Sequence, residues 1–284
     1  MRDARPSTTA QRVAMRRAAH QILDSPRVLD DPVALPILGP EAAAQLQSER
    51  GKLDISVARY FRAFMVARSR YAEDELARAI GRGASQYVIL GAGLDTFAYR
   101  NPYPESALRV FELDHPATQA WKLERLTAAG IAIPASVTFA PVDFERQSLS
   151  DGLARANFRR DAVTFFSWLG VTPYLTREAM TSTLALVASM PKGSGVVFDY
   201  AVPRSSLSFL GRLAFDRLAS RVAAAGEPFQ LFFEPGALAA QLASMGFQSI
   251  EDLGTDQINA RYFKDRADRL RVGGQLGRLM SASL

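Results

Sequence analysis

The chain has 284 residues, 48% of them hydrophobic and 22% charged, a composition typical of a globular protein with a large core. It has no cysteine, which excludes disulfides, thiolate nucleophiles and cysteine metal sites, and its two histidines lie far apart in sequence, so we expect no metal site. The formal charge of +5 comes mainly from dispersed arginines, which favours anionic small molecules over nucleic acid as partners. Because no run resembles a signal peptide or a membrane span, we expect a cytoplasmic protein with no membrane partner.

The first 80 residues have the pattern of a helical cap, and residues 81–284 that of an α/β core. Residues 1–9 are polar and are expected to fray, whereas residues 10–23 have an apolar face at helical spacing. Turn residues follow, and two short helices are predicted over residues 33–38 and 41–46. A longer helix is predicted over residues 56–80.

This longer helix carries an arginine within an aromatic stripe. Tyr60, Phe64, Arg68 and Tyr71 follow one another at steps of four, four and three residues, so they share a face. An arginine in that setting is costly to bury without a partner. Either its stem packs on the rings while the guanidinium reaches water, or the guanidinium binds a carboxylate, which its donor geometry matches.

The core begins with a buried strand and a glycine turn. Residues 87–90 are an apolar run, and Gly91 and Gly93 follow it directly. Glycine is needed where the backbone takes a positive φ or a ligand approaches closely. A turn of this kind at the carboxyl end of a first strand is where open α/β sheets bind nucleosides, although many Gly-x-Gly turns only connect elements.

The residues after the glycines indicate which nucleoside-containing ligand the turn can bind. A dinucleotide fingerprint would have a third glycine where this chain has Thr96, and a carboxylate such as Asp95 would repel a pyrophosphate. The turn therefore suits a ligand without phosphates, such as S-adenosylmethionine, better than a nicotinamide dinucleotide.

Two further strands are predicted to end in acids. Residues 109–114 alternate so that Glu112 and Asp114 point to one face, and Asp114, nearer the carboxyl end, is positioned to accept both ribose hydroxyls. Residues 137–142 form a third run ending at Asp143, whose side chain could reach an adenine amino group.

Three motifs together resemble one family. They are Gly-Ala-Gly-Leu-Asp-Thr at 91–96, Phe-Glu-Leu-Asp-His-Pro at 111–116 and Val-Asp-Phe at 142–144. This combination resembles the leucine carboxyl methyltransferase-like group of class I methyltransferases, which includes polyketide O-methyltransferases of bacterial secondary metabolism. The resemblance runs from about residue 10 to the end. It implies a Rossmann-like, mostly parallel seven-stranded sheet with an antiparallel last strand, S-adenosylmethionine as cofactor, and methyl transfer to oxygen, commonly of a carboxylate.

The resemblance also implies site residues. The family has an arginine about 25 residues before the second glycine, which matches Arg68, and a cation near the amino terminus, which matches Arg16 or Arg17; these would hold the carboxylate of the methionine part. The cofactor-binding set that follows is Arg16, Arg68, Gly91, Ala92, Gly93, Asp95, Asp114, His115, Asp143, Phe144, Trp168 and Leu169.

One position departs from the family pattern. The family has an acid just before a Gly-Val pair after the fourth strand, where this chain has Leu169. One contact is therefore missing or supplied from elsewhere. We name no catalytic base: His115 suits stacking or turn packing better, and an ionised carboxylate acceptor would need none.

The rest of the chain continues the alternation of strand and helix. Helices are predicted over 117–129, 149–156, 177–188 (capped by Thr176), 207–225 and 235–245, and strands over 162–169, 195–200, 247–253 and 276–284. The segment of about 204–232 interrupts the alternation and is a candidate lid. Trp168, Tyr174, Tyr200 and Arg204 are candidates to line the site, the last three as substrate-binding residues, although packing roles suit them equally.

The leading hypothesis is an O-methyltransferase acting on a carboxylate or a phenolic or alcoholic oxygen of a small, possibly aromatic or polyketide-like, acceptor. A cofactor-binding regulator without catalysis is the alternative that Leu169 keeps open, and a nicotinamide-dependent oxidoreductase is a third. A carboxyl methyltransferase of a protein terminus is a variant of the first. The chain could be a monomer or a homodimer.

Overall fold

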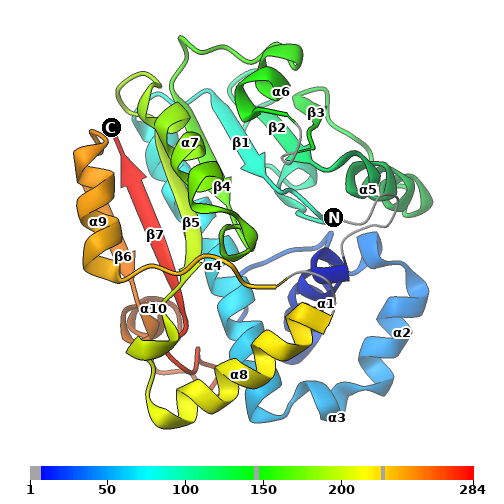
Figure 1. Cartoon of the computed structure of the whole chain (residues 1–284). Coiled ribbons are helices and arrows are strands. Elements are labelled where there is room, and N and C mark those ends of the chain that lie inside the picture. Colours follow the sequence, from blue (N-terminus) through cyan, green and yellow to red (C-terminus); the bar gives the residue numbers. More distant parts are fainter. Residues whose placement is uncertain (1–7, 144–146, 225–227) are drawn as a thin grey trace.

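The computed structural model describes residues 8–143, 147–224 and 228–284, and its centre is a seven-stranded sheet in the order β3-β2-β1-β4-β5-β7-β6 (Figure 1). Pairing is parallel from β3 to β5, whereas β7 is antiparallel to both β5 and β6. This is the predicted fold class. The strands are β1 (Gln86–Leu90), β2 (Arg109–Asp114), β3 (Val137–Pro141), β4 (Thr164–Trp168), β5 (Gly195–Ala201), β6 (Ser249–Leu253) and β7 (Gly277–Ser283).

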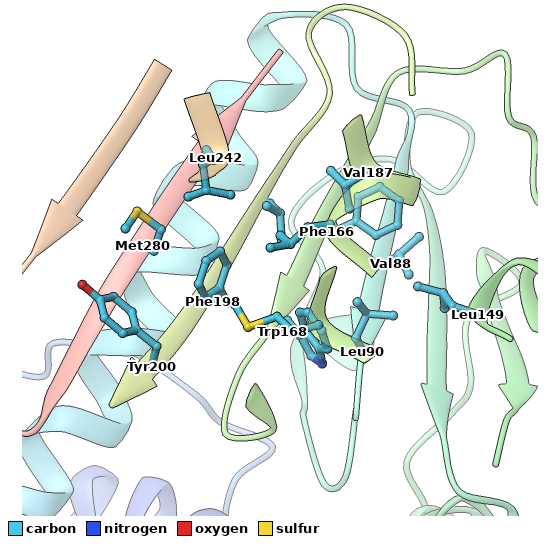
Figure 2. Close-up of a cluster of buried hydrophobic side chains, with 14 of the residues drawn as sticks. Val88, Leu90, Leu149, Phe166, Trp168, Val187, Phe198, Tyr200, Leu242 and Met280 are labelled. Carbon is cyan, nitrogen blue, oxygen red and sulfur yellow. The ribbon is translucent and has the colours of Figure 1, made fainter. Parts of the chain in front are cut away.

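Helices cover both faces of this sheet. One face packs on α6 (Leu149–Arg155), α7 (Arg177–Ala188) and α9 (Pro235–Ser244), and Figure 2 shows side chains of that core, among them Phe166, Trp168 and Phe198. The other face packs on α4 (Ser56–Gly81), η2 (Phe97–Tyr99) and α10 (Thr255–Tyr262). Because β1, β4 and β5 are buried on both faces, their sequences are mostly apolar and do not alternate with exposed polar residues.

The cap lies beyond the carboxyl ends of the parallel strands (Figure 1). It consists of α1 (Thr8–Leu23), η1 (Pro36–Leu38), α2 (Pro40–Ser48), α3 (Arg50–Leu53) and the start of α4, and α8 (Phe209–Ala224) lies beside it. A separate apolar cluster joins α1, η1 and α2 to α5 (Pro116–Ala128). The short elements η3 (Thr172–Tyr174) and η4 (Arg204–Ser206) follow β4 and β5.

A buried polar network fixes the cap to the long helix. Arg62 of α4 donates to both oxygens of Asp24, from Nε at 2.7 Å and Nη2 at 2.8 Å. The Nδ1 atom of His20, in α1, is 2.8 Å from Oδ2 of the same carboxylate. The Nε2 atom of His20 accepts the backbone N–H of Val28 at 2.9 Å. Since Arg62, His20 and Asp24 are all buried, each would carry a desolvation penalty without the others.

The structure differs from the sequence-based prediction in several short elements. Helices α3 and α10 and the short 3₁₀ helix η2 after the glycine turn are absent from the sequence-based prediction. The last two strands do pair antiparallel, as expected, but α10 separates them in the chain and β7 lies between β5 and β6. No helix within the described ranges has the length and apolarity needed to span a membrane.

Candidate active site

The glycine turn lies where β1 ends, and its backbone is tied to β2. Gly91 and Gly93 have φ of +67° and +48°, the left-handed region that favours glycine. The N–H groups of Gly91 and Ala92 both donate to the carbonyl of Leu113, at 2.8 and 3.0 Å. The turn therefore has one conformation set by its neighbour strand.

Both glycines also face other parts of the chain closely. A Cβ on Gly91 would lie 2.4 Å from Cγ2 of Val171, in the exit from β4, and one on Gly93 would lie 3.0 Å from Cβ of Ala10 in α1. The turn is thus enclosed between the fourth strand's exit and the first helix. Glycine is required here both for its backbone conformation and for the space.

Asp114 completes this turn. Its Oδ2 accepts the N–H of Gly93 at 2.5 Å and its Oδ1 accepts the N–H of His115 at 2.7 Å. Burial raises the pKa of Asp114, although these two hydrogen bonds and nearby Lys122 oppose the shift. Each carboxylate oxygen has two acceptor positions, so both oxygens can still accept from a ligand.

Arg68 extends from α4 to the end of β4. Its Nη1 donates to Oδ2 of Asp199 at 2.8 Å, and its Nη2 lies 2.8 Å from the position that a Cβ of Gly170 would occupy. Asp199, on β5, also accepts the N–H of Gly170 at 2.5 Å through Oδ1. The ion pair therefore holds the guanidinium at the edge of the sheet, and Arg68 as a residue is 5% exposed.

Arg16 lies near this guanidinium on the cap side. Its pKa is lowered, first by burial and then by the positive charges of Arg12 and Arg68. Its guanidinium carbon is 5.5 Å from the ring centre of Phe61, and its Nη1 donates to the carbonyl of Arg12. Two arginines therefore share a partly buried region, which favours an anion.

Arg17, the other cation considered, belongs to a different network. It donates to the carbonyl of Leu94, and its side chain lies 3.6 Å from Asp31 and 3.8 Å from Asp95. Asp31 accepts the hydroxyl of Thr96 at 2.6 Å. Asp95 and Thr96, whose presence disfavours a dinucleotide, are therefore held against the cap by Arg17 and Asp31.

His115 and Asp143 follow β2 and β3. His115 is the N-cap of α5, where its Nδ1 accepts the N–H of Ala117 at 3.3 Å. Asp143 is half-buried, and its backbone carbonyl accepts the N–H of Gln147 at 2.8 Å. Phe144, assigned to the cofactor site with it, lies outside the described residues.

Trp168 and Leu169 point to opposite faces of the sheet at the end of β4. Trp168 is buried with the α7 side of the core and lines a pocket of about 420 Å³ between the start of α6 and one side of α7. Val171, the residue against Gly91, lines the same pocket. Leu169 packs instead on the α4 side of the core.

The three proposed substrate residues are separated by the structure. Tyr174 lies in η3, next to the turn after β4, with its ring centre 5.4 Å from that of Phe229. The hydroxyl of Tyr200 points away from Trp168 (Figure 2) and donates to Asp252 at 2.9 Å. Arg204 forms an exposed ion pair with Asp216 at 2.8 Å. Of these three residues, Tyr174 belongs to the exit from β4, the segment in which Val171 lies against Gly91.

Sequence reasoning missed Asp199 and Val171. Asp199 stands inside an apolar run, Gly195–Ala201, where a charged residue needs a buried partner, and this was a usable signal. Val171 gave no signal, because its contact with Gly91 depends on how β1 and β4 pair.

Comparison with known proteins places this chain in a family. The leucine carboxyl methyltransferase family model matches residues 10–188, more than half of the chain. The chain belongs to the leucine carboxyl methyltransferase family. A relative from Bacillus subtilis strain 168, "Putative S-adenosyl-L-methionine-dependent methyltransferase YktD", is 35% identical over 291 residues, covering 95% of each chain. Another, a "Putative S-adenosyl-L-methionine-dependent methyltransferase" from Saccharopolyspora erythraea, is 33% identical over 203 residues, and the match covers 70% of this chain and 69% of that protein.

Solved structures agree with this membership at the level of fold. The crystal structure of a putative methyltransferase from Thermobifida fusca YX has a TM-score of 0.58 at 17% identity, covering 99% of this chain and 96% of its own. A DUF574 family protein from Streptomyces avermitilis has a TM-score of 0.55 at 16% identity, covering 99% and 98%. This leucine carboxyl methyltransferase family member is thus an S-adenosylmethionine-dependent methyltransferase with the Rossmann-like class I fold.

Proposed function

We propose that this methyltransferase transfers the methyl group to an oxygen of a small anionic acceptor, a carboxylate or an acidic phenol with an apolar body. The observation that carries the proposal is that ring nitrogens of both histidines are already engaged in hydrogen bonds within the protein. His20 is buried, with Nε2 accepting a backbone N–H and Nδ1 bound to Asp24, and the Nδ1 lone pair of His115 accepts a backbone N–H. Neither offers a free base, so an acceptor that is already ionised suits this site best.

The residues around the glycine turn fit the cofactor. In this proposal Asp114 accepts the ribose hydroxyls with its remaining lone pairs, and Arg16 and Arg68 hold the carboxylate of the methionine part. Among the described residues Arg16 has no carboxylate partner within 4 Å, which leaves its charge for an anion. We assign the adenine to Asp143 and to the pocket beside Trp168 and Val171.

When bound, S-adenosylmethionine supplies an electrophilic methyl group on a good leaving group. The protein's task is then mainly to align the acceptor oxygen with that methyl and to exclude water. The enclosed position of the turn, between α1 and the exit of β4, suits both tasks.

An aromatic cluster beside this site supports an apolar acceptor body. Phe229 lies 5.4 Å from Tyr174, 6.3 Å from Phe215 of α8 and 6.5 Å from Phe232, measured between ring centres. The segment holding Phe229 is hydrogen-bonded to η3, because the N–H of Gln230 donates to Pro173 at 2.7 Å. These half-buried rings therefore lie between the β4 exit and α8.

The proposal is tested by incubating the protein with S-adenosylmethionine and matched acceptors: aromatic and aliphatic carboxylic acids, phenols, alcohols, amines and thiols. Products are identified by mass and then treated with mild alkali, which hydrolyses a methyl ester but leaves a methyl ether intact. We expect products from carboxylates or acidic phenols only. Turnover restricted to amines or thiols would contradict the proposal, and cofactor binding without any turnover would favour a regulator.

A further inference from the structure

Asp199 is a buried carboxylate, 6% exposed, that the assignments above do not use. We propose that it is a positioning residue, which holds the Arg68 guanidinium and the Gly170 turn together in the geometry that receives the carboxylate of the cofactor. This inference rests on the role proposed above for Arg68.

The contacts of Asp199 use both of its oxygens. Oδ2 accepts from Nη1 of Arg68 at 2.8 Å, and Oδ1 accepts the N–H of Gly170 at 2.5 Å. Its own backbone carbonyl accepts the hydroxyl of Thr172, two residues beyond the turn. Asp199 therefore connects α4 to both sides of the exit from β4.

Strand pairing explains why Asp199 lies beside the turn. The register of β4 and β5 pairs Trp168, the last residue of β4, with Phe198 in the middle of β5, so the next residues, Leu169 and Asp199, are neighbours. Leu169 turns its side chain into the α4 side of the core. The carboxylate at this place in the molecule thus comes from the fifth strand rather than from the end of the fourth.

The charges around Arg68 give Asp199 its function. Arg16 and Arg68 repel each other across the cap boundary, and this repulsion lowers the pKa of Arg16 in addition to burial and the charge of Arg12. Within the described residues, Asp199 is the only ion-pair partner of Arg68. Without it, a nearly buried guanidinium would stand uncompensated beside a like charge and would move away.

The same pairing leaves donors of Arg68 for a ligand. Only Nη1 is engaged with Asp199, while Nε and Nη2 make no other hydrogen bond in the described part of the chain. Nη2 lies against Gly170, whose φ of +74° and missing Cβ allow that approach. Asp199 therefore fixes the plane of the guanidinium without using all of its donors.

The experiment compares two ligands on one variant. Calorimetric titration measures S-adenosylhomocysteine and 5′-methylthioadenosine, which lacks the amino acid part, on wild type and Asp199→Asn. We expect the variant to lose about tenfold or more in affinity for S-adenosylhomocysteine, as for a lost charge-assisted contact, and less than about twofold for methylthioadenosine. Equal losses for both ligands would overturn the proposal.

A matched control separates positioning from stability. Glu75 is also buried and lies on the same helix as Arg68, where it joins α4 to Ser281 of β7 rather than to the Gly170 turn, so Glu75→Gln should leave the ratio of the two affinities unchanged. Thermal unfolding of all variants shows which are folded. If Asp199→Asn does not fold, Asp199→Glu retains the charge but displaces it by one methylene, and the same loss of selectivity is expected.

Combining variants tells the two proposals apart. If Asp199 acts through Arg68, the double variant Arg68→Ala/Asp199→Asn should bind S-adenosylhomocysteine as weakly as Arg68→Ala, and additive losses would contradict this. If Arg68→Ala itself does not change the ratio of the two affinities, the proposed role of Arg68 fails. If Arg68→Ala changes the ratio and Asp199→Asn does not, only the inference about Asp199 fails.

Discussion

Two aspartates fix the backbone turns that enclose the site: Asp114, the last residue of β2, and Asp199, within β5. Each accepts a backbone N–H from a glycine in the left-handed region, Gly93 and Gly170 respectively, at 2.5 Å. In both cases a carboxylate stabilises a turn that glycine alone makes accessible. A substitution at either aspartate is therefore expected to act on a turn as well as on a ligand.

Asp114→Asn should weaken binding of S-adenosylhomocysteine about tenfold to a hundredfold, because charge-assisted hydrogen bonds to the ribose hydroxyls are lost. Calorimetric titration measures this affinity. Asp161→Asn is the control: it removes a charge from an exposed pair with Arg159 and should leave the affinity unchanged. Unchanged affinity in Asp114→Asn would rule out the ribose role.

The same residue predicts a pH dependence. Burial raises the pKa of Asp114, and only the ionised form accepts from both ribose hydroxyls. The affinity for S-adenosylhomocysteine should therefore fall as the pH is lowered, and the fall should begin above the ordinary range for an aspartate. In Asp114→Asn the affinity should not show this fall over the pH range in which circular dichroism reports a folded protein.

The sequence predicts those site residues that belong to a recognisable local pattern. The glycine turn, Asp114 and the cap of α7 follow from local patterns. The contact of Arg68 with Asp199 joins residues 131 positions apart, and its geometry depends on the pairing of β4 with β5. The family resemblance indicates Arg68, and the apolar run around Asp199 indicates a buried partner, but that these two residues pair with each other could be found only in the folded chain.

At the scale of elements, α1 and α4 are joined by the buried group of Asp24, Arg62 and His20. Arg62→Ala should lower the free energy of unfolding by about 3–5 kcal/mol, because it leaves the Asp24 carboxylate buried without its guanidinium partner. Urea unfolding measures the change. Asp30→Asn, which disrupts the exposed pair with Arg27, should change it by less than about 1 kcal/mol.

This group should also make stability depend on pH. Burial alone would raise the pKa of Asp24, but the hydrogen bonds from His20 and Arg62 outweigh it, so the pKa is lowered in the folded protein. Its contribution to stability is therefore complete above the unfolded value of about 3.9 and is lost as the pH falls through the lower folded value. Without Arg62 the pKa of Asp24 is lowered less. The free energy of unfolding of Arg62→Ala should therefore decrease less than that of the wild type as the pH falls through this range.

A smaller effect is expected at the start of α7. Thr176 is its N-cap and accepts the N–H of Ala179 at 3.2 Å. Thr176→Ala should lower the free energy of unfolding by about 1 kcal/mol. The control is Thr181→Ala, on the exposed face of the same helix, which should not destabilise the protein. Equal effects of the two substitutions on the urea midpoint would contradict the capping role.

The elements that sequence predicted well are those whose own residues carry the pattern. The helix over 56–80 and the strand over 195–200 agree with α4 and β5 to within one residue. Helix α10 was missed because it is polar and buries only Ile258, so it has no apolar stripe. The sequence predicts that the last two strands form an antiparallel pair. It does not predict that β7 lies between β5 and β6, since strand order depends on contacts between distant segments.

At the scale of the molecule, the sheet and α4 form a tightly packed core, whereas α8 is attached weakly. Every residue of β5 is buried, and α4 buries eleven. None of the described side chains of α8 is buried, and Phe209 and Leu210 are each 74% exposed. Its inner contact is made by Phe215, which packs on the aromatic cluster beside the site.

This contrast predicts how the molecule opens. Amides of α8 should exchange with deuterium at least about a hundredfold faster than those of β5, because local opening exposes little apolar surface there. An acceptor that is methylated should slow exchange on α8 when added with S-adenosylhomocysteine, since its apolar body would contact the cluster under Phe215. The cofactor product alone should protect the segment around Gly91 and leave α8 nearly unchanged. Slow exchange of α8 in the free protein, or equal protection by the product alone, would show that this helix belongs to the fixed core and does not open for the acceptor.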